Sequence, residues 1–149
     1  MHIDIIKLRT VREESVNYKI TQNVGSPEEI YQMAQHIGLW DNAEEEFWIL
    51  CLDTKMKPCG LHMVSKGNLN SSIVHPREIF KRAILNNAAS IICMHNHPSG
   101  DPSPSQNDID ITKRIDEAGT LMGVPLMDHI IIGDGIYISL KEKMLKRKC

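Results

Sequence analysis

The sequence contains little cysteine and none of it in paired motifs. Four cysteines, Cys51, Cys59, Cys93 and Cys149, occur among 149 residues, and no two of them have CxxC spacing. Thiolate zinc ribbons and dithiol redox motifs need closely spaced cysteines, so both classes are excluded. Two of the cysteines lie inside apolar runs, where a free thiol behaves as a small hydrophobic side chain. We therefore expect a cytoplasmic protein whose fold needs no disulfides.

Long hydrophobic runs and a strong excess of charge are also absent. No stretch approaches the roughly 18 apolar residues of a membrane span, and the first residues lack the apolar core of a signal peptide. The 17 Lys and Arg residues against 19 Asp and Glu residues give a net charge of −2. The chain as a whole therefore has no field that attracts polyanions. Its 42% hydrophobic and 24% charged residues are typical of one soluble globular domain.

The charge is nevertheless unevenly distributed. Five of the 17 basic residues fall in the last nine positions, and an acidic cluster of Asp41 and Glu44 to Glu46 precedes an apolar run. A basic tail of this kind is either a solvated terminus or a contact for nucleic acid. The basic residues of the tail are Lys141, Lys143, Lys146, Arg147 and Lys148.

Apolar periodicity and its punctuation predict an α/β (α+β) fold. Short strands are expected within residues 2–20, at 47–52, 60–65 and 89–94, and in a hairpin formed by 124–132 and 136–140. Three helices are expected, one capped by Ser26 and ended by Gly38, one opened by Pro76, and one capped by Ser105 and ended by Gly123. No linker divides the chain. Residues 1–38 are expected to pack as an extension on a core of residues 39–149.

One irregular, proline-rich loop holds the residues that suggest chemistry. His95 and His97 are two positions apart at the end of an expected strand, so both imidazoles should point to the same side. Asp108 follows at the start of the next expected helix, and the loop can return its carboxylate to the histidines. Two His and one carboxylate, with a fourth position for water, are the ligands of a catalytic zinc site. One zinc ion per chain is expected.

Several of these residues also have structural interpretations. Ser105 and Asp108 fit a capping box, which needs no metal. Glu44, Glu45 and Glu46 offer a general base near the metal, but they also fit a solvated acidic turn. Ser105 can donate to an oxyanion. Asp128 and His129 fit a hydrogen-bonded pair on a strand, and the isolated histidines His2, His36 and His62 fit ordinary core or surface positions.

The combined pattern resembles a known signature. His95-x-His97-Pro98 followed by Ser105-x-x-Asp108 resembles the JAMM (MPN-plus) metalloprotease motif, and segments 52–55, 74–84, 87–92, 95–108 and 128–133 look like the RadC-type JAB-domain family. The resemblance implies a JAB/MPN fold with cytidine deaminase-like layering, a curved mixed sheet flanked by helices. It also implies that His95, His97 and Asp108 bind zinc, that Ser105 lies on the oxyanion side and that Glu45 is the general base. His75 matches a family position and is expected to be structural.

The function implied by this resemblance is zinc-dependent hydrolysis. The expected activity is that of a metallopeptidase or isopeptidase acting on a peptide or isopeptide-linked protein. The alternative is a DNA-binding or nuclease-like protein of DNA repair or a mobile element, with the basic tail as its contact. Longer RadC-type proteins carry a helix-hairpin-helix module that residues 1–38 do not resemble. A third possibility is a catalytically silent binding module. The intact set of expected site residues argues against it, because such a module has no need of an open metal site. The sequence leaves the oligomeric state open.

Overall fold

The computed structural model describes residues 1–15, 24–67 and 74–146. At positions 145 and 146 it describes the backbone alone. Helices and strands alternate along the chain. The elements are α1 (Pro27–His36), a 3-10 turn (Leu39–Asp41), β1 (Glu46–Leu52), β2 (Pro58–Lys66), α2 (Pro76–Leu85), β3 (Ser90–Asn96), α3 (Gln106–Met122), β4 (Leu126–Ile132), β5 (Tyr137–Ser139) and α4 (Leu140–Lys146).

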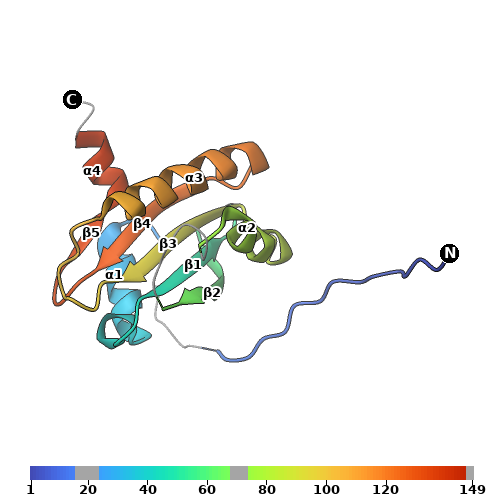
Figure 1. Ribbon diagram of the computed structural model, residues 1–149, viewed down its shortest axis with the longest axis horizontal. Helices are drawn as coiled ribbons and strands as arrows, with labels where there is room; N and C mark the ends of the chain where they lie inside the picture. The colour runs from blue at the N-terminus through green and yellow to red at the C-terminus, as the bar shows by residue number, and fades with distance from the viewer. Residues whose placement is uncertain (16–23, 68–73, 147–149) are drawn as a thin grey trace.

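The five strands form one mixed sheet in the order β2-β1-β3-β4-β5 (Figure 1). β3 and β4 are parallel and are joined through α3, whereas the other neighbouring strands are antiparallel. A parallel pair needs such a crossover, since a tight turn can join only antiparallel strands. In this strand order β3 lies in the middle of the sheet, and all seven of its residues are buried.

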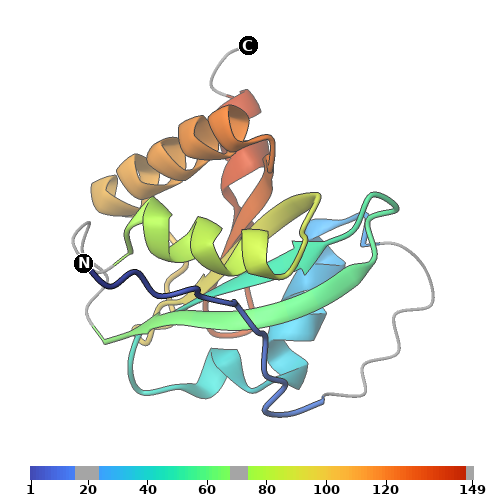
Figure 2. The same cartoon turned by 90° about the vertical axis from the view of Figure 1, so that its right-hand side faces the viewer.

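Helices cover both faces of this sheet (Figure 2). α2 and α3 pack on one face, where Ile79, Phe80, Ile111 and Ile115 meet alternate residues of β1 and β3. α1 packs on the other face against the remaining residues, such as Leu50, Ile92 and Met94. Since successive side chains of a strand face opposite sides, β3 supplies both cores. The expected α/β domain with a mixed sheet between helices is confirmed.

The helix boundaries follow the punctuation of the sequence. Ser26 and Glu29 form a capping box at the start of α1, and Ser105 and Asp108 form one at the start of α3. Gly123 ends α3 in the left-handed conformation, with φ 70°. His75 is the N-cap of α2, where its Nδ1 accepts a hydrogen bond from the backbone of Arg77. The structural interpretation of His75 is therefore supported by a specific contact.

The N-terminal part of the chain differs from the expectation in one respect. Residues 1–15 contain no strand and are exposed, whereas α1, the expected helix of the same extension, packs on the core; the remainder of the second expected strand, 16–20, lies outside the described residues. An alternating apolar pattern supplies no hydrogen-bond partner, and within the described residues no sheet strand pairs with this segment. At the other end, α4 includes Lys141, Lys143 and Lys146 of the basic tail, and Lys141 is exposed. Arg147 and Lys148 lie outside the described residues.

Hydrogen bonds from two parts of the chain hold the start of α4. Asp128 of β4 accepts hydrogen bonds from the backbone of Lys141, 3.1 Å, and from the Ser139 hydroxyl, 2.7 Å. The Ser139 hydroxyl also accepts from the backbone of Glu142, 3.1 Å, so the start of α4 is capped both by the preceding residue and by a distant strand. Burial raises the pKa of Asp128, although these hydrogen bonds oppose the shift. In the described part of the chain, no helix is both long and apolar enough to cross a membrane.

Candidate metal centre

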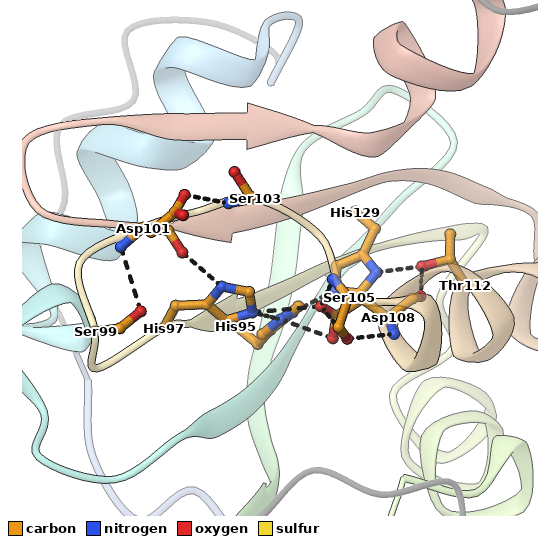
Figure 3. Close-up of polar contacts among 9 residues, drawn as sticks. All are labelled: His95, His97, Ser99, Asp101, Ser103, Ser105, Asp108, Thr112 and His129. Carbon is orange, nitrogen blue, oxygen red and sulfur yellow. Dashed lines mark hydrogen bonds and ion pairs between the residues drawn. The ribbon is translucent and has the colours of Figure 1, made fainter.

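The end of β3 carries two histidines on the same face of the sheet. His95 is fully buried, and His97 follows two residues later, where the strand gives way to the loop. Their Nε2 atoms lie 3.0 Å apart, and Figure 3 shows a contact drawn between the two rings. The ring of Phe47 on β1 stacks on His95 with ring centroids 5.9 Å apart. The strand alternation expected from the sequence therefore brings both imidazoles to one point.

Asp108 reaches this point from the first turn of α3. Its Oδ1 lies 3.2 Å from His95 Nε2, and its Oδ2 lies 3.4 Å from His97 Nε2. The same Oδ2 accepts hydrogen bonds from the Ser105 backbone, 2.7 Å, and from the Ser105 hydroxyl, 2.8 Å. Asp108 is therefore both a capping-box residue and a partner of the histidines. The two interpretations are compatible, because the cap fixes the carboxylate in the position a ligand needs.

The loop between His97 and Asp108 is held against the sheet. The backbone of Asp134 donates to the Gly100 carbonyl, 2.9 Å, and that of His97 donates to the Ile132 carbonyl, 2.8 Å. A Cβ on Gly133 would lie 2.4 Å from the Gly100 carbonyl oxygen and 2.7 Å from a carbon of Pro102. This close approach requires glycine at position 133. The loop is thus a rigid connection from β3 back to α3.

The donor set fits a metal ion. One ligand atom from each of His95, His97 and Asp108 can be chosen so that all lie within 4.8 Å of one another. His97 Nδ1 hydrogen-bonds to the Asp101 carbonyl, 2.8 Å, which can only accept. When the ring is neutral, its proton is therefore on Nδ1 and the Nε2 lone pair can bind a metal. Imidazole nitrogens and a carboxylate are ligands that zinc accepts.

The electrostatics of the metal-free site show the same preference for a cation. The hydrogen bond to Asp108 raises the pKa of His97, so a proton takes up part of the negative charge. Burial opposes ionisation of Asp108, but hydrogen bonds from the two histidines hold the pKa of this carboxyl far below its usual range. A buried carboxylate remains charged only where such partners are present. Both shifts favour binding of a positive ion.

A second layer of polar residues lies behind His95. Its Nδ1 is 2.7 Å from His129 Nε2, and His129 Nδ1 is 2.7 Å from the hydroxyl of Thr112. Thr112 in turn bonds to the carbonyl of Asp108, 2.6 Å. Burial holds the pKa of His129 well below its ordinary value, so this ring is neutral. Asp128 and His129 are hydrogen-bonded to each other on β4, through the backbone N–H of His129 and the Asp128 carboxylate, 2.7 Å, while the His129 ring bonds to other partners.

The three consecutive glutamates have different environments. Glu45 precedes β1 and shares the parity of Phe47, and its charge helps to raise the pKa of His97. Glu46 is buried, where its carboxylate accepts from Trp48 Nε1, 2.9 Å, and pairs with Lys66, 3.3 Å. Glu44 is exposed. Of the three, Glu45 is the half-buried carboxylate whose charge acts on the site.

Asn96 holds this acidic segment in place. Its buried side chain accepts from the backbone of Glu46, 2.7 Å, and donates to the carbonyls of Glu44, 3.0 Å, and Asn42, 3.3 Å. Asn96 lies between the two histidines in sequence and therefore faces the opposite way. The segment that carries Glu45 is thus fixed by the same strand that carries the ligands.

Sequence reasoning missed the roles of Asn96, Thr112 and the His129 ring. Strand alternation could have predicted that Asn96 faces away from the two histidines, because it lies between them on a strand. Helical spacing could have predicted that Thr112 lies close to Asp108, because it is one helical turn further along. His129 lies on β4, and only the parallel pairing of β3 with β4 brings it beside His95.

Comparison with known proteins agrees with this geometry. The sequence profile of the RadC-like JAB domain matches residues 24–145. The UPF0758 protein of Methanosarcina barkeri is 48% identical over 122 residues, which are 82% of this chain and 53% of the relative. That of Geobacillus thermodenitrificans is 56% identical over 101 residues, 68% of this chain and 45% of the relative. The chain spans about half the length of these curated relatives. It belongs to the RadC-like JAB domain family.

Proposed function

We propose that this protein is a zinc-dependent hydrolase that cleaves peptide or isopeptide bonds. The observation that carries the proposal is the convergence of His95, His97 and Asp108 at the end of β3, next to the segment that holds Glu45. His95 and His97 would bind zinc through Nε2, and Asp108 through its carboxylate. When bound, zinc would supply the Lewis acidity that makes water nucleophilic near neutral pH.

Glu45 is the proposed general base and general acid. It would take the proton of the attacking water as the oxygen bonds to the carbonyl carbon, and then give that proton to the nitrogen as the C–N bond breaks. The half-buried position of Glu45 and the effect of its charge on His97 support this role. Glu46 is less suited, since Trp48 and Lys66 already bind its carboxylate.

Ser105 is proposed to stabilise the oxyanion of the tetrahedral intermediate. Its side chain is exposed at the start of α3, beside Asp108. In the metal-free structure its hydroxyl donates to Asp108, so it would have to rotate toward the substrate to serve the oxyanion. The exposed position of Ser105 allows that rotation.

The test measures zinc content and hydrolysis separately. We expect about one zinc per wild-type chain and loss of zinc in His97→Ala and Asp108→Asn. With fluorogenic peptides and lysine ε-linked isopeptides, Glu45→Gln should keep its zinc and lose roughly 10²–10⁴-fold in kcat. The matched variant Glu46→Gln should remain active. Equal activity in Glu45→Gln and wild type would remove the proposed base.

A metal-free wild type would instead favour the alternative function. If zinc added back also fails to bind, the DNA-associated role becomes the better explanation. Lys141 and Lys143 of α4 would then be candidate phosphate contacts. Replacing both with glutamine should weaken binding to duplex DNA and reduce its salt dependence, which fluorescence anisotropy measures.

A further inference from the structure

We propose that Thr112 and His129 are positioning residues that fix the tautomer of His95, so that the Nε2 lone pair of His95 faces the metal position. The inference rests on the proposed zinc site and extends it to residues that touch neither metal nor substrate. Three contacts connect the residues in a line from α3 through β4 to β3. They are Thr112 to the Asp108 carbonyl, 2.6 Å, Thr112 to His129 Nδ1, 2.7 Å, and His129 Nε2 to His95 Nδ1, 2.7 Å.

The direction of these hydrogen bonds is set at the Asp108 carbonyl. A carbonyl oxygen can only accept, so the single hydroxyl proton of Thr112 is donated to it. The Thr112 oxygen must then accept from His129, which places the proton of that ring on Nδ1. A neutral imidazole carries one proton, so His129 Nε2 has a lone pair and accepts from His95 Nδ1. His95 therefore keeps a proton on Nδ1, and in the neutral ring its lone pair is on Nε2.

The surroundings of His129 permit no other direction. The ring is buried against the edge of Phe47, with centroids 5.2 Å apart. The neighbouring carboxylate, Asp128, bonds instead to Ser139, to the backbone of Lys141 and to the backbone of His129. Both ring nitrogens of His129 are used within the line of contacts. A buried ring with two filled positions has a single stable orientation.

The line of contacts, which we call the relay, also connects Asp108 with His95. Thr112 bonds to the carbonyl of Asp108, and His129 bonds to His95, so each end of the relay is a proposed metal ligand. His97 obtains the same tautomer from the Asp101 carbonyl. Both imidazoles are therefore prepared for metal before it arrives. Partners of this kind typically change metal affinity by about 10–100-fold.

The experiment compares Thr112→Val with Thr112→Ser. Valine keeps the shape of threonine but removes the hydroxyl, whereas serine retains it. Thr120→Val is the matched control, because Thr120 makes the same type of bond to the Asp116 carbonyl, 3.0 Å, in an exposed part of α3. We expect Thr112→Val to lose about 10–100-fold in zinc affinity, and Thr112→Ser and Thr120→Val to bind like wild type. Chelator competition measures the affinity.

Long-range ¹H–¹⁵N spectra of the metal-free protein give a second readout, independent of zinc. Wild type should show His95 and His129 both protonated on Nδ1, and Thr112→Val should show a mixture of tautomers. A wild-type His129 protonated on Nε2 would overturn the proposal, as would unchanged zinc affinity in Thr112→Val. If wild type binds no zinc while its histidines show the expected tautomers, the proposed function fails and the relay stands.

Discussion

Replacing Ser105 with alanine tests whether one hydroxyl both starts α3 and holds a metal ligand. The hydroxyl accepts from the backbone of Asp108, 3.1 Å, and donates to Asp108 Oδ2, 2.8 Å. Alanine removes both bonds. The carboxylate keeps the backbone N–H of Ser105 at 2.7 Å, so Ser105→Ala weakens its support without abolishing it.

The expected loss of stability follows from these two bonds. Loss of an N-cap side chain costs about 1 kcal/mol. The bond to the carboxylate contributes about 1 kcal/mol more, below the usual value for a charged acceptor because Ser105 is exposed. A total of about 2 kcal/mol lowers the melting temperature of a domain of this size by roughly 4–8 °C. Zinc affinity should fall about 10-fold, since one of two donors to the ligand remains.

Urea denaturation of the metal-free protein measures the change in unfolding free energy, and chelator competition measures zinc affinity. Ser105→Thr is the matched control, because threonine keeps the hydroxyl and is a good N-cap. It should unfold within about 0.5 kcal/mol of wild type. The reasoning is refuted by a Ser105→Ala protein that unfolds at the wild-type urea midpoint and binds zinc with wild-type affinity.

Three further predictions concern the surroundings of the site. Gly133→Ala should displace the loop at Gly100 and cost about 1–3 kcal/mol, together with zinc affinity; a melting curve and a chelator titration that match wild type would contradict this. Asn96→Ala should keep the ligands but release the segment that carries Glu45, so we expect lower kcat at full zinc content, checked by metal analysis of the assayed sample. In the metal-free protein the pKa of His97 is raised above its ordinary 6.5 and that of His129 is lowered well below it. Folding therefore favours the proton at His97 and disfavours it at His129. Unfolding free energy should fall as the pH rises above 6.5 through the folded pKa of His97, and also as it falls below 6.5. Denaturation across this range measures the profile, and Asp108→Asn should lose the alkaline part.

The parts of the fold that local sequence determines were predictable. Ser26 with Glu29 and Ser105 with Asp108 mark helix starts because their bonds join residues three positions apart. The apolar runs of β1 and β3 identify buried strands because this signal, too, lies in residues that are close together in the sequence. The His95 and His97 pair was predictable from strand alternation, and the structure places both rings at one point.

The rest depends on contacts between distant segments. The start of α4 has a local cap in Ser139, which accepts from the backbone of Glu142, but it is completed by Asp128 of β4, a contact that the local sequence does not show. The segment at residues 2–11 has a strand-like pattern, but that pattern cannot show whether a sheet edge will accept it. The family resemblance favours Glu45 among the three glutamates, and the register of β1 adds that Glu46 lies on the side of Trp48 and Glu45 on the side of Phe47.

The tripeptide His95, Asn96 and His97 has a mechanical consequence. His95 and His97 face α3, whereas the side chain of Asn96 hydrogen-bonds to the backbone of Glu44 and Glu46 on the opposite face of the sheet. A slip of β3 by one residue would exchange the two faces, so that the imidazoles and the amide would lose their partners together. The positions of the two imidazoles and of the segment that carries Glu45 therefore both depend on β3. An insertion or deletion within β3 cannot disturb one of them and spare the other.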